Sequence, residues 1–294
     1  MGSALRPDAR SGRRRVPLAW LALLPFFAYA LGFLFIPAAD TVIGAFQKQG
    51  GGATLDNVRK TLNQPYLDQY WLTIKISLIT AGGGCVIGLC IAYAAIREGT
   101  PRFIRTTLTT FSGVAANFAG VPLAFAFIAT LGTIGIVTGF MRDHLGFDPY
   151  QHGFTIFGET GVEITYMYFQ IPLMILVIAP AIDGLRAEWR EAASNLGASA
   201  WQFWRHVGIP VLLPSILGAF ILLFGNSFSA YATAYGLAGN SVFLVPITIG
   251  FYLSGNVLSD PHFAQALAFG MFVVLAVMML LYIPLQRRSA RWMR

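Results

Sequence analysis

The chain has 294 residues, of which 56% are hydrophobic and only 11% carry a charged side chain. Soluble domains carry about 25% charged residues, so this composition excludes an ordinary soluble fold. The formal net charge of +7 would suit a nucleic acid. However, the basic residues lie in loops and ends between apolar stretches, which indicates membrane topology, and no nucleic-acid partner is predicted. We predict an all-α membrane protein in contact with the lipid bilayer.

Six apolar stretches are long enough to cross a bilayer core, which takes about 20 helical residues. The predicted transmembrane helices cover residues 18–36, 70–96, 106–131, 161–182, 208–231 and 262–284. A signal peptide is the alternative for the first stretch, but its apolar run exceeds the roughly 7 to 15 residues of a signal core, which favours a retained helix. The predicted organisation is a basic tail over 1–16, a six-helix domain over 17–286 and a basic tail over 287–294.

The basic residues predict which side of the membrane each loop faces. Cytoplasmic loops carry an excess of Lys and Arg. Both chain ends and the loops after the second and fourth helices hold 15 of these residues, whereas the three opposite loops hold 4. We therefore predict that both termini and the loop over 184–210 are cytoplasmic. Lys75 lies near the outer end of the second helix and is assigned no role.

The 184–210 loop carries its own helix-ending and helix-starting signals. Gly197 follows a helical apolar pattern and can adopt the left-handed conformation that ends a helix. Ser199 and Gln202 stand at the spacing of a capping box. These signals predict a bent pair of short helices. Its apolar underside would consist of Leu185, Trp189, Ala192, Leu196, Trp201, Trp204 and Val207.

Patterns typical of catalysis or cofactor binding are missing from the sequence. The phosphate-binding pattern Gly-x-x-x-x-Gly-Lys-Ser/Thr does not occur, and the four histidines have no metal-ligand spacing. Cys85 and Cys90 fit neither a zinc site nor a redox Cys-x-x-Cys. We predict no catalytic residue, no metal site and no cofactor in this chain, and therefore not an enzyme. Gly84 and Gly88 form a G-x-x-x-G pattern that permits close helix packing.

The loop also resembles a named signature, the EAA loop. The matching residues are Glu191, Ala192, Ala193, Gly197, Val207, Ile209 and Pro210. The EAA loop is typical of permease subunits of binding-protein-dependent ABC importers, the maltose/methionine-permease-like family. The resemblance extends over residues 71–284 and implies a type I ABC importer permease fold in a bacterial cytoplasmic (inner) membrane. Loop lengths and residues 226–240 look most similar to the spermidine/putrescine permease branch.

The resemblance implies a set of partners. These are a second permease subunit (a copy or a paralogue), an extracytoplasmic solute-binding protein and two cytoplasmic ATPases that bind ATP and Mg. The EAA loop would be the coupling helix that docks on an ATPase. The implied coupling positions are Arg190, Glu191, Ala192, Ala193, Gly197 and Ser199.

Polar and aromatic residues within the apolar stretches are candidates for a solute path. They are Asn117, Phe220, Phe224, Asn226, Ser227, Ser229 and Tyr231. Each could instead pack or hydrogen-bond between helices. Eight acidic residues near the outer side suit a cation such as a polyamine, but sugar and oxyanion importers use the same scaffold, so fold does not fix the solute. A secondary carrier and a non-transporting assembly subunit stay open as alternatives.

Overall fold

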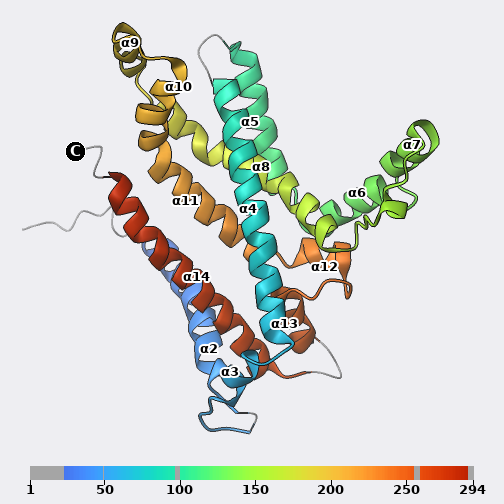
Figure 1. Ribbon diagram of the computed structural model, residues 1–294. Helices are drawn as coiled ribbons and strands as arrows, with labels where there is room; N and C mark the ends of the chain where they lie inside the picture. Colours follow the sequence, from blue (N-terminus) through green and yellow to red (C-terminus); the bar gives the residue numbers. More distant parts are fainter. Residues whose placement is uncertain (1–22, 49, 97–99, 255–258, 291–294) are drawn as a thin grey trace, which may run out of the picture.

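A computed structural model gives the arrangement of the chain and describes residues 23–48, 50–96, 100–254 and 259–290 (Figure 1). Within these ranges the regular structure is helical, apart from one isolated β-bridge between Gln47 and Ala53. Six apolar helical segments are long enough to cross a membrane. The predictions of an all-α architecture and six transmembrane segments are confirmed. The predicted tail over 1–16 and residues 291–294 lie outside the described ranges.

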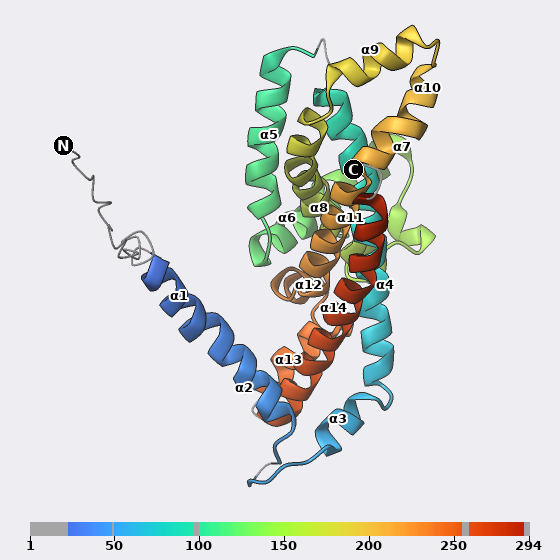
Figure 2. The same ribbon diagram turned by 90° about the vertical axis from the view of Figure 1, so that its left-hand side faces the viewer.

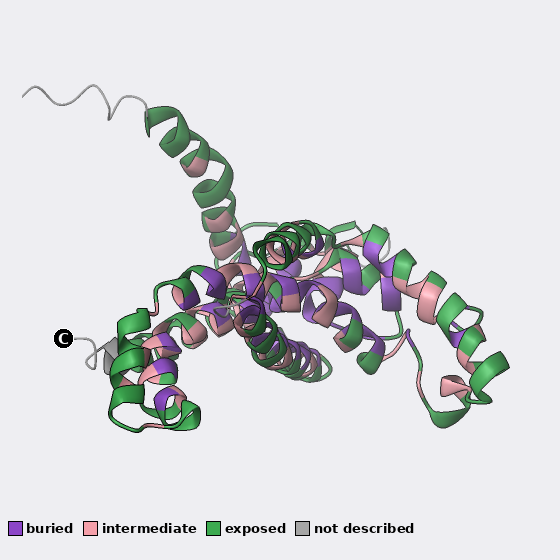
Figure 3. Ribbon diagram, turned by 90° about the horizontal axis from the view of Figure 1, so that it is seen from above, coloured by how far each residue is buried: buried purple, intermediate pink, exposed green. Residues whose placement is uncertain are grey.

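The first membrane segment is a rod that ends later than the sequence suggests. It consists of α1 (Leu24–Ala30), a π-helical turn η2 (Leu31–Phe35) and α2 (Ile36–Ala45). The π-turn comes just before Pro37, whose missing N–H interrupts α-helical hydrogen bonding. None of the apolar window of this rod is buried in the chain. Figure 3 shows the rod standing out from the bundle with its surface exposed.

Three further segments are long helices close to the predicted ranges. They are α4 (Tyr66–Ile96), α8 (Glu159–Asp183) and α14 (Pro261–Ala290). The fifth segment runs from Ala200 to Phe228 and joins α10 (Ala200–Phe203), η4 (Trp204–Gly208) and α11 (Ile209–Phe228). Helix α14 continues through the predicted start of the second basic tail at residue 287.

The prediction of one continuous third helix over 106–131 is wrong. The structure has α5 (Arg102–Asn117) and α6 (Val121–Leu131), separated by three residues. Gly120 adopts a φ of 78°, and Pro122 lies in the first turn of α6 without an N–H to donate to the preceding turn. Helix α5 alone is about 24 Å long, shorter than a bilayer core of about 30 Å.

Short helices fill the loops that the sequence left largely unstructured. They are α3 (Asp56–Thr61), η3 (Pro149–His152), α12 (Ala232–Ala238) and α13 (Val245–Ser254). Helix α13 lies in the loop between the fifth and sixth membrane segments. Helix α7 (Ile136–Leu145) belongs with α6 to the third apolar segment, Val121–Leu145. Figure 1 shows α6 and α7 running away from the axis of α5, so the outer part of the molecule broadens on that side.

Helix α8 is the centre of the bundle and packs against α4, α5 and α11. The closest approach uses the predicted G-x-x-x-G. A Cβ atom on Gly84 would lie 2.8 Å from Gln170 Cβ, and one on Gly88 would lie 2.6 Å from Met174 Cβ. Only glycine permits these helices to approach so closely. The G-x-x-x-G thus sets the spacing of α4 and α8.

The two ends of the bundle differ in the way that the charge pattern predicts. The α9–α10 loop lies at one end, and the start of α1 and the end of α14 are the ends of those helices nearer to it (Figures 1 and 2). Helix α3 and the Gly50–Gly52 hairpin lie at the other. This arrangement agrees with cytoplasmic termini and a cytoplasmic loop.

Candidate coupling loop and solute path

The bend predicted at Gly197 is a complete Schellman motif. Helix α9 (Ala187–Asn195) ends there, and Gly197 has a left-handed φ of 76°. The Ala198 N–H donates to the Ala193 carbonyl at 3.0 Å, and the Gly197 N–H donates to the Ser194 carbonyl at 2.9 Å. This is the bonding pattern that ends a helix on a glycine. Nothing lies within 4 Å of a Cβ placed on Gly197, so glycine is required there by backbone conformation and not by space.

The predicted capping box starts the next helix. The Gln202 N–H donates to Ser199 Oγ at 3.3 Å, and the Ser199 N–H donates to Gln202 Oε1 at 2.7 Å. Two otherwise unpaired backbone donors are satisfied within the loop. The end of α9 and the start of α10 are therefore both fixed by hydrogen bonds, with Gly197 and Ala198 between them.

Two aromatic side chains pack under the loop, and one of them, Trp204, joins it to α4. Phe203 is buried, and the Arg190 guanidinium lies over its ring at 5.7 Å from the centroid. Trp204 Nε1 donates to the Tyr93 hydroxyl at 3.2 Å, and the two rings meet edge to face with centroids 4.6 Å apart. A cavity of about 200 Å³ remains under the bend. Sequence patterns missed Tyr93, because it comes from α4, more than a hundred residues away.

The opposite face of the loop is apolar and exposed. Leu196 is 88% exposed and Trp201 is 69% exposed. The predicted apolar underside is therefore divided: Trp204 packs against Tyr93, whereas Trp201, in the first turn of α10, is turned outward. Glu191 and Ala192 are also exposed, and Ala193 is half-buried. The candidate coupling residues thus surround an uncovered apolar tip at the cytoplasmic end.

Two predicted path residues lie inside the bundle. Phe224 is fully buried and stacks on Phe228, with ring centroids 5.4 Å apart. Ser227 is 2% exposed, and its Oγ lies 2.8 Å from Thr80 Oγ1. Phe220 is half-buried against the same core. In this structure Phe224 and Ser227 contact only protein, and they join α11 to its neighbours.

The predicted path residues Asn226 and Ser229 share an uncovered face of α11 with two residues that were not predicted, Ser215 and Leu222. Ser215, Leu222, Asn226 and Ser229 are exposed, and their spacing of seven, four and three residues places them on one side of the helix. We refer to these four residues as the α11 stripe. Asn226 Nδ2 donates to Gln170 Oε1 at 3.4 Å, and Gln170 Nε2 donates to the Leu223 carbonyl at 2.7 Å. The buried Gln170 amide therefore orients Asn226.

Helix α5 carries a second uncovered polar face. Arg102, Thr106, Thr110 and Asn117 are exposed and recur at helical spacing with the half-buried Gly113, and we call these five residues the α5 stripe. Asn117 Nδ2 donates to the Gly113 carbonyl at 2.8 Å. An amide side chain has further hydrogen-bonding positions that lipid cannot fill, so such faces are expected to meet water or protein.

The predicted path residue Tyr231 lies at the outer end of α11. Its ring stacks on Tyr235 with centroids 5.4 Å apart and lies against Gly250 of α13. Beside it, a groove of about 510 Å³ is lined by residues of α13 and α14 and by Ser229. The groove continues the outer end of the α11 stripe.

Charged groups also meet on the outer side. Lys75, which the sequence left without a role, pairs with Glu159 at 2.7 Å between Nζ and Oε2. Near the same helix ends, a groove of about 580 Å³ is lined in part by Asp68 and Glu159. The pair therefore joins the outer ends of α4 and α8.

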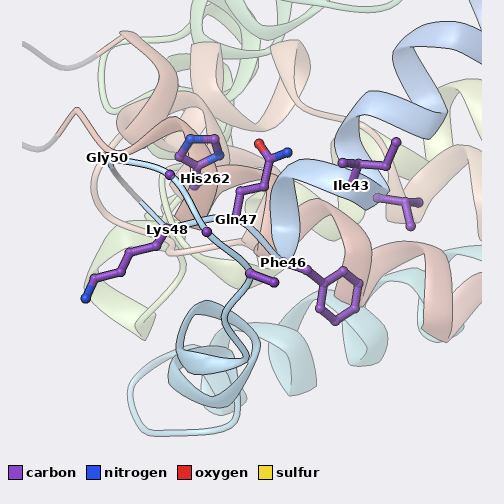
Figure 4. Close-up of a pocket in the computed structure, with 10 residues that line it drawn as sticks. Ile43, Phe46, Gln47, Lys48, Gly50 and His262 are labelled. Carbon is purple, nitrogen blue, oxygen red and sulfur yellow. The ribbon is translucent and has the colours of Figure 1, made fainter.

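A separate outer cavity lies between α2, the glycine hairpin and the start of α14. It measures about 660 Å³, and Phe46, Gln47, Lys48 and His262 contribute to its lining (Figure 4). In Figure 4 the Lys48 side chain extends away from His262. No acidic side chain is among its described lining residues, and the α11 stripe does not take part in it.

Comparison with known proteins places this geometry in a family. Residues 84–294, well over half of the chain, match the family described as binding-protein-dependent transport system inner membrane component. The chain belongs to this family. It is therefore a multi-pass membrane component of a transport system and not an enzyme.

The fold is also that of solved importers. A bacterial ABC transporter involved in the import of the acidic polysaccharide alginate gives a TM-score of 0.71, with 92% of this chain and 95% of that chain covered at 19% identity. The MetNI methionine ABC transporter, in an inward-facing conformation, gives 0.58, with 78% and 99% covered at 16% identity. The predicted type I ABC importer permease fold is confirmed.

Two curated relatives are named as sulfate permeases. A probable sulfate transport system permease protein of Helicosporidium sp. is 28% identical over 58% of this chain and 60% of its own length. The sulfate transport system permease protein CysT of Escherichia coli is 26% identical over 63% of this chain and 64% of its own. The matches thus span less than two thirds of these relatives. The spermidine/putrescine branch is not confirmed.

Proposed function

We propose that this chain is one of two permease subunits that enclose the solute path of an ATP-driven importer in a bacterial cytoplasmic membrane. Its α9–α10 loop docks on a cytoplasmic ATPase that binds ATP and Mg. A second such ATPase serves the companion permease, and an external binding protein delivers the solute. The candidate path runs along the α5 and α11 stripes, which no part of the described chain covers.

The apolar tip of the loop carries this proposal. Leu196 lies outside the six apolar segments, and Trp201 is the second residue of the fifth segment, at its cytoplasmic end. Burying one large apolar side chain contributes about 1.5–3 kcal/mol. An apolar groove on a partner would supply that burial. The Schellman bend and the capping box hold the tip in one shape before any partner binds, which lowers the entropy cost of docking.

Co-purification tests the docking. The double variant Leu196→Glu and Trp201→Glu should lose the ATPase during purification, while membrane insertion is unchanged. Leu62→Glu is the matched control, because Leu62 is equally an exposed leucine but lies at the outer end, 62% exposed. Retention of the ATPase by the double variant would contradict the docking site.

For the solute, we favour a small oxyanion of the sulfate class. The curated relatives support this class. Helices α5 and α11 contain no Asp or Glu, and Arg102 stands at the inner end of the α5 stripe. A polyamine path would need carboxylates to replace the hydration of the cation. The acidic residues of the outer loops, which suggested a cation, belong to neither stripe, and the exclusion of Lys and Arg from outer loops produces a similar charge asymmetry.

Uptake measurements separate the solute classes. Cells lacking their own sulfate importers, but carrying this chain with its ATPase, companion permease and binding protein, should accumulate radiolabelled sulfate. Accumulation of putrescine, with no accumulation of sulfate, would instead support a polyamine as the solute. Sulfate uptake in the absence of the ATPase would indicate a secondary carrier instead.

A further inference from the structure

An ion pair lies where the central helix enters the coupling loop. Arg105 Nη2 of α5 contacts Asp183 Oδ2, and Asp183 is the last residue of α8. Helix α9 begins four residues later, at Ala187. Two other ion pairs occur among the described residues: Lys75 with Glu159 on the outer side, and Arg142 with its neighbour Asp143. Of the three, only the Arg105–Asp183 pair joins two helices at the cytoplasmic end.

Each charge of the pair lies at the helix end that disfavours it. The C-terminus of a helix carries a partial negative charge, and Asp183 is at the C-terminus of α8. The N-terminus carries a partial positive charge, and Arg105 follows within about one turn of the start of α5. Positive-inside topology accounts for Arg105 but not for Asp183. The α8 dipole therefore disfavours a carboxylate at Asp183, and the favourable interaction available to it is the ion pair with Arg105.

The ion pair connects to α8 the first residues of α5, which are not packed against the rest of the described chain. All six residues from Arg102 to Thr107 are exposed, and packing against the rest of the chain begins at Leu108. Further along α5, Ser112 and Ala115 are buried. The outer part of α5 is therefore held by packing, and the inner turn and a half is connected to α8 through Arg105.

The fold itself depends little on this pair. The Arg105 and Asp183 side chains are 45% and 38% exposed. Ion pairs this exposed contribute about 0–1 kcal/mol to stability. Removing one partner should leave the bundle folded. A loss of transport in such a variant would therefore reflect a lost movement and not a lost fold.

We propose that the Arg105–Asp183 pair transmits the movement of the coupling loop to the inner end of α5. When the ATPase displaces the loop, the last turn of α8 and the first turns of α5 then move together, and the α5 stripe changes its position along the path. Both are positioning residues that contact neither ATP nor solute. The inference rests on the proposed function of the loop.

The test uses the complete complex with its ATPase, companion permease and binding protein in proteoliposomes, with inorganic sulfate as the probe. Arg105→Ala and Asp183→Ala should each hydrolyse ATP but lower the sulfate moved per ATP roughly fivefold or more, the lower range of coupling between sites. The exchange of Arg105→Asp with Asp183→Arg should restore the ratio to within about twofold, because the pair is rebuilt with each charge at its favoured helix end. Net charge, and so topology, is unchanged in the exchange.

Lys75→Ala is the matched control, because the Lys75–Glu159 pair also joins two helices and its side chains are similarly exposed, at 44% and 47%, but it lies on the outer side, away from the coupling loop. Its ratio should equal that of the wild type. Unchanged ratios in both single variants, or an exchanged pair as poor as the singles, would overturn the proposal. A wild-type complex that shows no ATP hydrolysis in response to the loaded binding protein would instead count against the proposed function, and the inference would fall with it.

A second readout needs no solute. Spin labels at Thr107 of α5 and Ser194 of α9, both exposed, report the distance between α5 and the loop. That distance should stay constant when ATP is trapped in the wild-type complex and change in Arg105→Ala. An equal response in the two proteins would show that the pair carries no movement.

Discussion

At the residue scale, the geometry of the coupling loop depends on Gly197. Its left-handed φ of 76° is one that other residues adopt at a cost, and its N–H closes half of the Schellman motif. The side chains around it, Leu196 and Trp201, are exposed because the chain turns at this point. A single backbone conformation therefore decides which side chains a partner can reach.

Substitutions at Gly197 should separate assembly from transport. Gly197→Pro cannot adopt the φ and lacks the N–H, so uptake should be abolished while membrane insertion is retained. Gly197→Ala should destabilise the bend by about 1–2 kcal/mol and lower uptake partially. Uptake and protease protection are the measurements. Gly82→Ala, at a helical glycine with nothing within 4 Å of its Cβ, should behave as wild type. Normal uptake by Gly197→Pro would refute the coupling role.

Substitutions at the neighbours Asn226 and Ser227 test which face of α11 lines the solute path. Asn226→Ala should raise the KM for uptake about tenfold, since Asn226 lies on the α11 stripe, and should lower stability by about 0.5–1.5 kcal/mol because it loses the hydrogen bond to Gln170. Ser227→Ala should leave the KM unchanged and lower stability by about 0.5–1.5 kcal/mol, because it loses the hydrogen bond to Thr80. The opposite pair of KM effects would place the path on the other face of α11.

At the scale of elements, hydrophobicity located the membrane segments, but backbone chemistry decided their continuity. The third stretch is uniformly apolar enough to suggest one helix, yet Gly120 and Pro122 divide it into α5 and α6. In contrast, α8 runs unbroken through Pro172 and Pro180. A proline alone is tolerated inside a membrane helix, whereas a proline two residues after a left-handed glycine ends one here.

The attachment of the coupling loop is a property of two elements. Trp204→Ala removes the ring contact and hydrogen bond to Tyr93, so the loop should detach from α4, and trypsin should cleave at Arg186 or Arg205 faster than in wild type. Tyr93→Phe loses only the hydrogen bond, worth about 1 kcal/mol, and should have a smaller effect.

Trp201→Ala is the control for that experiment. Trp201 is the same residue type, three residues earlier, in α10, but it is exposed and, among the residues that the structure describes, makes no hydrogen bond or ring contact with α4. Its cleavage rate should equal that of the wild type. Equal acceleration by both tryptophan variants would mean that the loop is not anchored through Trp204.

At the scale of the whole molecule, the chain leaves both apolar and polar helix faces uncovered by its own described residues. The rod from Leu24 to Ala45 has no buried apolar window, and the polar α5 and α11 stripes are uncovered. Lipid can cover the rod but not polar side chains. The chain thus has the surface expected of one part of a larger membrane assembly, in agreement with its family.

Sidedness can be measured on the intact chain. In a background without Cys85 and Cys90, Asn195→Cys in the coupling loop should react with an impermeant thiol reagent only after the membrane is opened. Gly51→Cys in the outer hairpin should react in intact cells. Both positions are exposed, so access depends on the membrane and not on packing. Labelling of Asn195→Cys from outside would invert the topology and exclude cytoplasmic coupling.

Features that depend on neighbouring residues were predictable. The number of membrane segments, their sidedness, the glycine bend and the capping box each arise from composition or from contacts within about one helical turn. The G-x-x-x-G of α4 also predicted a close contact, although not that Gln170 and Met174 would fill it. The domain boundaries and the functional roles of the coupling and path residues stay predictions.

By itself, then, the sequence determined an all-α, six-segment membrane protein with a bent cytoplasmic loop, because hydropathy, charge and capping act locally. Only the tertiary structure decided that Ser227 is buried while Asn226 is exposed. It also decided that Trp204 packs against α4 while Trp201 is exposed, and that Arg105 pairs with Asp183. These outcomes depend on residues far apart in the chain. Which face of a helix is covered is set by the helices that pack against it, and periodicity along one helix does not contain that information.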